Sequence, residues 1–194
     1  EHEDEHEDEH EEVEIDYFDR DINSTSYAFS ISNELNDFVS FNLGLSYLER
    51  APSGVELFMN GPHLATGRYE VGNTSLEAEE ANNIDLTLGY ENNGFFGSLT
   101  FFRNNIDNYI YLLDETEEEH EEHEEHHEGL ILSNYLQKDA EMDGYELEFG
   151  RNFGFYQGEL LVSFGFDSVS AEFADGINIP RIAPQRSVYT LAYT

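Results

Sequence analysis

The sequence predicts an all-β fold, an antiparallel transmembrane β-barrel, on three observations. Apolar and polar residues alternate with a period of two over several segments, as in Tyr27 to Glu34, "YAFSISNE". Short and long connections between these segments follow one another in strict alternation. The absence of eighteen consecutive apolar residues excludes a transmembrane helix. Hydropathy of this kind does not detect barrel strands, which span about 9 to 11 residues and alternate in polarity.

The alternation predicts seven strands. Their ranges are 27–34, 38–50, 83–90, 95–113, 135–151, 156–173 and 187–194. The short connections are 35–37, 92–94 and 152–155, and the long ones are 1–23, 51–81, 113–135 and 173–186. Outer-membrane barrels have short periplasmic turns and long extracellular loops. A soluble antiparallel sheet is the alternative, although it has less reason to segregate its loop lengths in this way.

Charge and composition exclude several functions. Lys and Arg number 8 against 43 Asp and Glu, a formal charge of −35, so electrostatic binding to nucleic acid or to anionic lipid headgroups is not expected. Cations are the natural partners. The chain has no Cys, which excludes thiolate ligands, disulfides and Cys nucleophiles. A bound metal must therefore be held by His and carboxylate.

Two acidic runs concentrate the histidines. Residues 1–12 read "EHEDEHEDEHEE" and residues 114–129 read "DETEEEHEEHEEHHEG". The candidate metal ligands in these runs are His2, His6, His10, His120, His123, His126, His127 and Glu124. Imidazole binds Zn²⁺, Cu²⁺ and Ni²⁺, and several His in a short segment can assemble a site. A solvated acidic loop would explain the Glu, but not why seven of the eight His fall in these runs. We place zinc ahead of copper and nickel, and oxygen-only Ca²⁺ binding is a lesser alternative.

One stretch matches a catalytic motif by composition alone. His123, Glu124 and His127 satisfy H-E-x-x-H, in which two His bind zinc and the Glu activates water. In a tract made of Glu and His this match is expected by chance. A protease would also need a third ligand and a flanking amphipathic helix, whereas the neighbours are predicted strands. The sequence therefore does not predict an enzyme.

Residues 50–73, "RAPSGVELFMNGPHLATGRYEVGN", carry a more specific signal. They resemble the "RAP…ELF…GPH-AT-x-E-GN" signature of TonB-dependent outer-membrane receptors, and Leu76 and Glu79 match its "L-x-x-E" continuation. The tail "IPRIAPQRSVYTLAY" is similar to the family's "PRIPP-x-R" loop, with Ala183 where the family usually has Pro. The resemblance runs from Ser24 onward, and the His-rich acidic loop looks most like the zinc-uptake receptors.

The resemblance implies an outer-membrane receptor of a Gram-negative bacterium that transports a divalent transition metal, with energy from a TonB complex. Family barrels have twenty-two strands, so we expect residues 1–194 to be an internal piece of a larger barrel, without a signal peptide or plug domain. The segments 1–23 and 113–135 are expected to be extracellular loops, and 51–81 an outer-side loop. His63, within that loop, could bind metal, although a hydrogen-bonded structural role suits it better.

Two alternatives stay open. A siderophore or haem receptor could carry these acidic loops incidentally. A surface β-protein could bind metal without transporting it. The first is separated from zinc transport by uptake competition, and the second by whether the rest of the gene encodes a plug and more strands.

The acidic runs predict pH-dependent metal capture. Neighbouring carboxylates favour imidazolium and raise the pKa of the histidines, whereas a ligand must be deprotonated. We therefore expect zinc capture to weaken steeply between about pH 7.5 and about pH 5.5, a range that brackets the ordinary His pKa of about 6.5. Calorimetric titration of a peptide spanning residues 116–129 measures this, and equal affinity at both pH values would contradict it.

Overall fold

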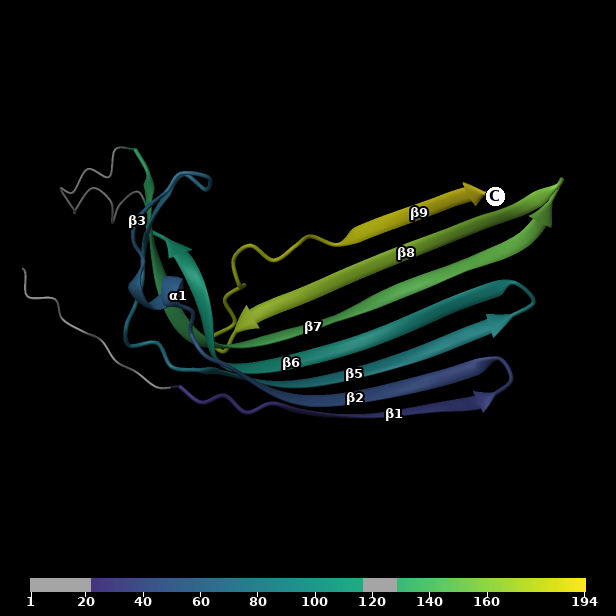
Figure 1. The fold of residues 1–194 in the computed structure, drawn as a ribbon, viewed down its shortest axis with the longest axis horizontal. Helices are drawn as coiled ribbons and strands as arrows, with labels where there is room; N and C mark the ends of the chain where they lie inside the picture. The colour runs from purple at the N-terminus through teal and green to yellow at the C-terminus, as the bar shows by residue number, and fades with distance from the viewer. Residues whose placement is uncertain (1–21, 117–128) are drawn as a thin grey trace, which may run out of the picture.

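A computed structural model describes residues 22–116 and 129–194. The strands form one nine-stranded, strongly curved sheet (Figure 1). The elements are β1 (Tyr27–Asn36), β2 (Val39–Arg50), α1 (Gly54–Phe58), β3 (Asn60–His63), β4 (Arg68–Val71), β5 (Glu79–Asn92), β6 (Phe95–Asp114), β7 (Ile131–Phe155), β8 (Gly158–Phe173) and β9 (Arg186–Tyr193). Within the described ranges, no helix is long and apolar enough to cross a membrane.

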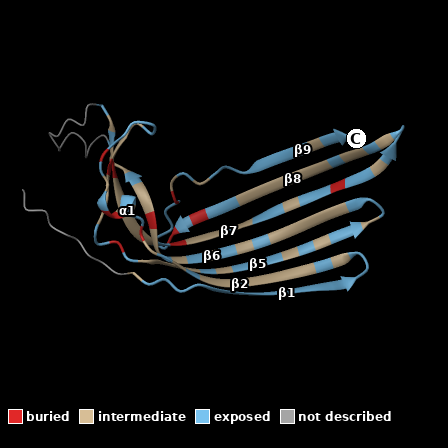
Figure 2. Ribbon diagram, in the orientation of Figure 1, coloured by how far each residue is buried: buried red, intermediate tan, exposed pale blue. Residues whose placement is uncertain are grey.

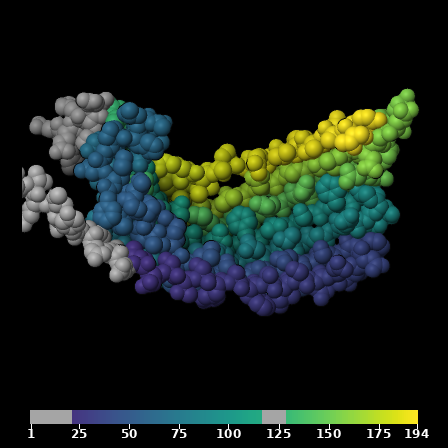
Figure 3. All heavy atoms as spheres, viewed as in Figure 1, coloured from purple at the N-terminus to yellow at the C-terminus, as the bar shows by residue number. Residues whose placement is uncertain are grey.

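The seven long strands pair with their sequence neighbours in the order β1-β2-β5-β6-β7-β8-β9, and every one of these pairs is antiparallel. This confirms the predicted sheet. Within the described residues the sheet is not closed, because β1 pairs only with β2 and β9 only with β8. Figure 3 shows the strands as one continuous curved layer.

The segment 51–81 is more ordered than the irregular loop that its sequence predicts. It contains α1, β3 and β4, and β4 pairs in parallel with the first residues of β7. β3 and β4 have only four residues each, which is too few for a period-two pattern to be visible in the sequence. Their pairing depends on β7, whose start at Ile131 lies four residues before the predicted one.

The prediction of a turn at 152–155 is wrong, because the chain turns later in the sequence. β7 continues to Phe155, and Gly154 pairs with Glu159 in the ladder with β8. The chain turns instead at Tyr156 and Gln157, where Tyr156 has a φ of 55°. Glycine in "NFGF" suggested a turn, but this glycine lies in a regular strand.

The turn between β5 and β6 is where the sequence predicts it. Asn93 and Gly94 have φ angles of 50° and 79°, the left-handed pair that the type I′ turn of a two-residue hairpin requires. A Cβ on Gly94 would lie 2.2 Å from the carbonyl oxygen of Asn152. Glycine is thus needed both for the turn and for the close approach of the next hairpin.

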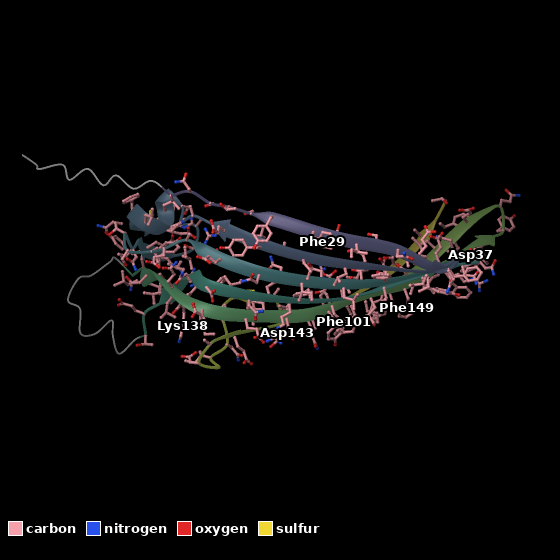
Figure 4. The ribbon with its side chains drawn as sticks, turned by 90° about the horizontal axis from the view of Figure 1, so that it is seen from below. Phe29, Asp37, Phe101, Lys138, Asp143 and Phe149 are labelled. Atoms are coloured by element: carbon pink, nitrogen blue, oxygen red, sulfur yellow. The ribbon has the colours of Figure 1, made fainter. Side chains whose placement is uncertain are left out.

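The long strands have two unlike faces. On one face, cross-strand neighbours are apolar: Ile31 pairs with Leu43, Leu43 with Leu86, and Leu86 with Phe101. The opposite face carries small and polar residues, such as Thr87 opposite Thr100, whose hydroxyls lie 2.9 Å apart. Figure 4 shows Phe101 and Phe149 on one side of the sheet. An outward apolar face and an inward polar face match a transmembrane barrel wall.

The apolar zone crosses the hydrogen-bonded rows obliquely. The row that starts at Ile84 becomes polar at Arg103 and Asp143, whereas a row nearer the turns is still apolar at Phe149, Phe164 and Tyr189. An apolar band that runs parallel to the membrane crosses these cross-strand rows at an angle only if the strands are tilted from the membrane normal. Barrel strands tilt by about 35 to 45°.

Buried side chains gather away from the turns. Leu57, Leu76 and Ile110 form one small cluster, and Phe173 and Ile179 belong to a second. Figure 2 shows most buried positions at the end of the sheet where α1, β3 and β4 lie. We call this the outer end. The stability of the rest of the sheet depends on the medium that contacts its two faces, because no second layer of described residues covers it.

Because the sheet has two unlike faces, substitution by arginine should lower the free energy of unfolding by different amounts at two neighbouring positions. Leu86→Arg places a charge in the apolar zone and should lower the free energy of unfolding by about 2–4 kcal/mol in lipid vesicles. Thr87→Arg on the inner face should cost less than about 1 kcal/mol. Denaturant titration of the complete barrel in vesicles measures both. Equal losses at the two positions would contradict the assignment of faces.

Candidate functional site

The described residues nearest to both acidic runs lie at the outer end of the sheet. The run at 114–129 connects β6 to β7, and its first residue, Asp114, lies opposite Ser133 in the ladder. The first run precedes Thr25, whose backbone N–H donates to Glu49 at 2.6 Å beside the outer end of β2. The predicted ligands themselves lie outside the described residues: His2, His6, His10, His120, His123, Glu124, His126 and His127. Their role as ligands stays a prediction.

Asp114 joins three segments at the base of the second run. It accepts hydrogen bonds from Arg68 on β4 at 2.8 and 2.9 Å, and from Arg181 in the connection after β8 at 2.7 Å. The Ser133 hydroxyl on β7 also donates to it at 2.7 Å. The Arg68 guanidinium, with the Ser133 and Arg181 donors, holds the pKa of Asp114 well below its usual range. The carboxylate is therefore charged at any physiological pH.

Glu70 is a second junction, and it is 4% exposed. One of its oxygens lies 2.8 Å from His63 Nδ1, and the other accepts the Tyr135 hydroxyl at 3.1 Å. Burial, together with the charge of Glu70, raises the pKa of Tyr135 to about 12, so the phenol keeps its proton and donates. His63 thus makes the hydrogen bond expected of a structural residue. Metal binding by His63 stays a prediction.

Arg50 ties the end of β2 to α1 and β5. Its guanidinium contacts Glu56 at 2.9 and 3.1 Å and also donates to Glu79. Glu56 accepts the backbone N–H of Ser53, and the Ser53 hydroxyl accepts the N–H of Glu56, which completes a capping box at α1. Burial raises the pKa of Glu56, but the Arg50 and Ser53 donors outweigh it, so the net pKa is lowered.

Gly72 lets the chain after β4 approach the backbone at the end of α1. Its N–H donates to the Met59 carbonyl at 2.6 Å, and an added Cβ would lie 2.7 Å from backbone atoms of Leu57 and Phe58. Leu76, just beyond, is 1% exposed and packs with Leu57 and Ile110. The segment is therefore docked on β6 by apolar contact as well as by ion pairs.

The matched signature residues are thus largely structural. Arg50, Glu56, His63, Glu70 and Glu79 lie in the contacts described above. The residues that the sequence analysis did not single out are Asp114, Arg68 and Arg181. Asp114 was counted as part of an acidic run, and only the fold shows that it is the anchor on which two arginines converge. Both arginines lie inside the quoted motifs, Arg68 in "GRYE" and Arg181 in "IPRIAP". Membership of these motifs was therefore the only sign in the sequence that the two residues matter.

Free negative charge dominates the inner face. Opposite the apolar zone, this face carries Glu34, Asp85, Glu91, Glu146, Glu148, Glu159 and Asp167, and one described base, Arg186, which contacts Asp167 at 2.9 Å. Of the seven described basic side chains, six contact a carboxylate: Arg50, Arg68, Arg103, Lys138, Arg181 and Arg186. Little positive charge is left to receive an anion on this wall.

The described residues do not contain a preformed metal centre. Over 22–116 and 129–194, no group of three or more His, Asp or Glu is arranged to hold an ion. The acidic wall attracts cations through its negative potential.

The Asp114 junction predicts a local loss of order on mutation. Asp114→Asn should leave Arg68 and Arg181 without a charged partner and destabilise the outer end by about 1–2 kcal/mol, since the groups are part exposed. Amide exchange should quicken at β4 and in residues 178–182 while the mid-strand amides of β7 stay protected. Because the pKa of Asp114 is lowered, the pairing persists above the ordinary Asp value of about 4 and is lost only as pH falls below it.

Asp143→Asn is the matched control for that experiment. Asp143 is exposed on the outward face of the same strand that carries Ser133, and Figure 4 shows it beside Phe101. The control should leave exchange at β4 unchanged. If both variants behave alike, Asp114 is not the anchor.

Comparison with known proteins agrees with this geometry. The curated ferrienterobactin receptor of Escherichia coli (strain K12) is 30% identical over 100 residues, which cover 45% of this chain and 13% of that protein. Among solved structures, the copper transporter OprC has a TM-score of 0.62 at 17% identity, covering 86% of this chain and 23% of OprC. The FrpB iron transporter from Neisseria meningitidis has a TM-score of 0.55 at 16% identity, covering 87% of this chain and 24% of FrpB.

These structures share the barrel-wall fold with this chain, which spans about a quarter or less of their length. The family model for TonB dependent receptor-like β-barrels matches residues 3–194. The chain therefore belongs to the TonB-dependent receptor β-barrel family, whose members lie in the outer membrane of Gram-negative bacteria.

Proposed function

We propose that this chain is part of a receptor that imports a divalent transition metal ion, zinc ahead of copper or nickel. In this proposal the segments 1–23 and 113–135 are extracellular loops that collect the ion, and 51–81 is an outer-side loop. A TonB complex supplies the energy for passage. The receptor performs no catalysis.

One observation carries the proposal: the described residues that flank both His-rich acidic runs lie at the outer end. Seven of the eight His fall in the two acidic runs, and the described residues next to both runs lie at that end (Figure 1). The Asp114 junction, with Arg68 and Arg181, fixes the root of the second run. Many weak sites on one rim raise the local concentration of a cation before it enters the barrel.

The charges of the wall favour a free cation over an anionic chelate. The inner face has seven carboxylates opposite the apolar zone, and the Arg186 guanidinium there contacts Asp167. A cation that leaves the acidic rim therefore meets a negative potential along the wall as well. An anion would have to displace existing ion pairs or be repelled.

A ferric siderophore is the second candidate, favoured by one specific observation. The curated relative that is 30% identical over 100 residues is a ferrienterobactin receptor. The copper transporter OprC, similar in fold, fits the first candidate. Under the siderophore alternative, the acidic runs would be incidental to transport.

Replacing the histidines of one run tests coordination against charge. In the complete receptor, His120, His123, His126 and His127 are all changed to Gln, and zinc uptake by zinc-starved cells is measured with a radioactive tracer. Initial uptake at limiting zinc should fall about tenfold, since multivalent collection is lost, and uptake at saturating zinc should change little.

The matched control changes Glu118, Glu119, Glu121 and Glu122 to Gln and keeps every histidine. This variant should lose less uptake than the histidine variant. The proposal fails if the histidine variant transports zinc normally. It also fails if the receptor imports an iron–siderophore complex with which excess zinc does not compete.

A further inference from the structure

An apolar groove lies on the outward face near the turns. It is open to the surroundings and has a volume of about 450 Å³, and its outward-facing lining is Val39, Leu88, Tyr90, Phe95, Leu99, Leu147 and Phe149. Its floor is Gly97, which pairs with Tyr90 on one side and Phe149 on the other. Because Gly97 has no side chain, the apolar face is hollowed at this point.

Arg151 lies beside one end of this groove, two residues beyond Phe149 on the same face of β7. Its guanidinium stacks over the Phe95 ring, 4.3 Å from the centroid, with the Phe153 ring at 5.6 Å. Among the described basic residues it alone has no carboxylate within ion-pair distance. Its outward neighbours across the ladder, Phe95 and Val162, are apolar.

Stacking leaves the guanidinium able to bind an anion. Contact with an aromatic ring uses the flat face of the group, while the N–H donors point outward in its plane. A phosphate accepts two parallel N–H bonds from such a fork. In a membrane barrel, this position between aromatic side chains lies at the level of the lipid headgroups.

We propose that the groove and Arg151 together bind one phospholipid. An acyl chain lies in the hollow over Gly97, and the headgroup phosphate is held by the Arg151 guanidinium. Short turns mark the periplasmic side of an outer-membrane barrel, so the lipid belongs to the inner leaflet. The chain's net charge of −35 does not oppose this, because the acidic inner face lies on the other side of the sheet. The site does not depend on which substrate is transported.

Native mass spectrometry of the complete receptor in detergent tests the site with two lipids. Dioleoylphosphatidylglycerol carries the phosphate, and dioleoylglycerol has the same acyl chains without it. Arg151→Gln should lower retention of the phospholipid about tenfold, as expected for loss of a charge-assisted contact, and leave dioleoylglycerol unchanged. Leu88→Trp, which fills the groove, should lower retention of both lipids.

Arg103→Gln is the matched control. Arg103 is on the outward face of the neighbouring strand, is 52% exposed and contacts Glu141, so its loss should leave both lipids bound as in the parent. The proposal is overturned if Arg151→Gln retains the phospholipid, or if it loses both lipids equally. Lipopolysaccharide retained through Arg151 in place of the phospholipid would also overturn it, as would a lipid-free dimer that Leu88→Trp disrupts.

Discussion

The antiparallel backbone ladder is the constraint on which the rest of this chain depends. A hydrocarbon layer offers no water to unpaired N–H and C=O groups, so each spanning residue must bond to a neighbouring strand. Seven long strands do this in sequence order. Once the ladder is fixed, alternate residues face lipid or the inner wall, and a shift by one residue would exchange the two faces completely. The strict pairing of Leu43, Leu86 and Phe101 on one face is the visible result.

Beyond the apolar zone, ion pairs and a small apolar contact replace lipid as the stabilising environment. Asp114 gathers Arg68 and Arg181, and Glu70 gathers His63 and Tyr135. These junctions connect segments that are far apart in sequence, so α1, β3 and β4 are fixed over the end of the sheet. The same junctions fix the roots of β6 and β7, from which the His-rich run emerges.

Electrostatic potential separates the two faces and the two ends of the sheet. The inner wall is acidic, and its described base is paired. The outward face near the turns has the opposite character, with Arg151 stacked between aromatic rings. The first arrangement suits a cation in transit, and the second suits a lipid phosphate. One strand, β7, serves both, because Glu146 and Glu148 face inward while Phe149 and Arg151 face outward.

The sequence by itself determined the fold class, most strand positions and the concentration of His and carboxylate side chains in two runs, because alternation, turn residues and composition are local properties. The Asn93–Gly94 turn was readable for this reason. Tertiary structure alone decided what depends on distant partners. Four-residue strands in 51–81 form only because β7 extends to meet them, and Gly154, read as a turn residue, lies in a strand because Glu159 pairs with it. Likewise, strand pairing determines which side chains lie beside Asp114 and Arg151. Asp114 meets two arginines, whereas Arg151 has no carboxylate partner among the described residues. Local pattern sets which face a residue can occupy, but the partners it meets there are set by residues tens of positions away.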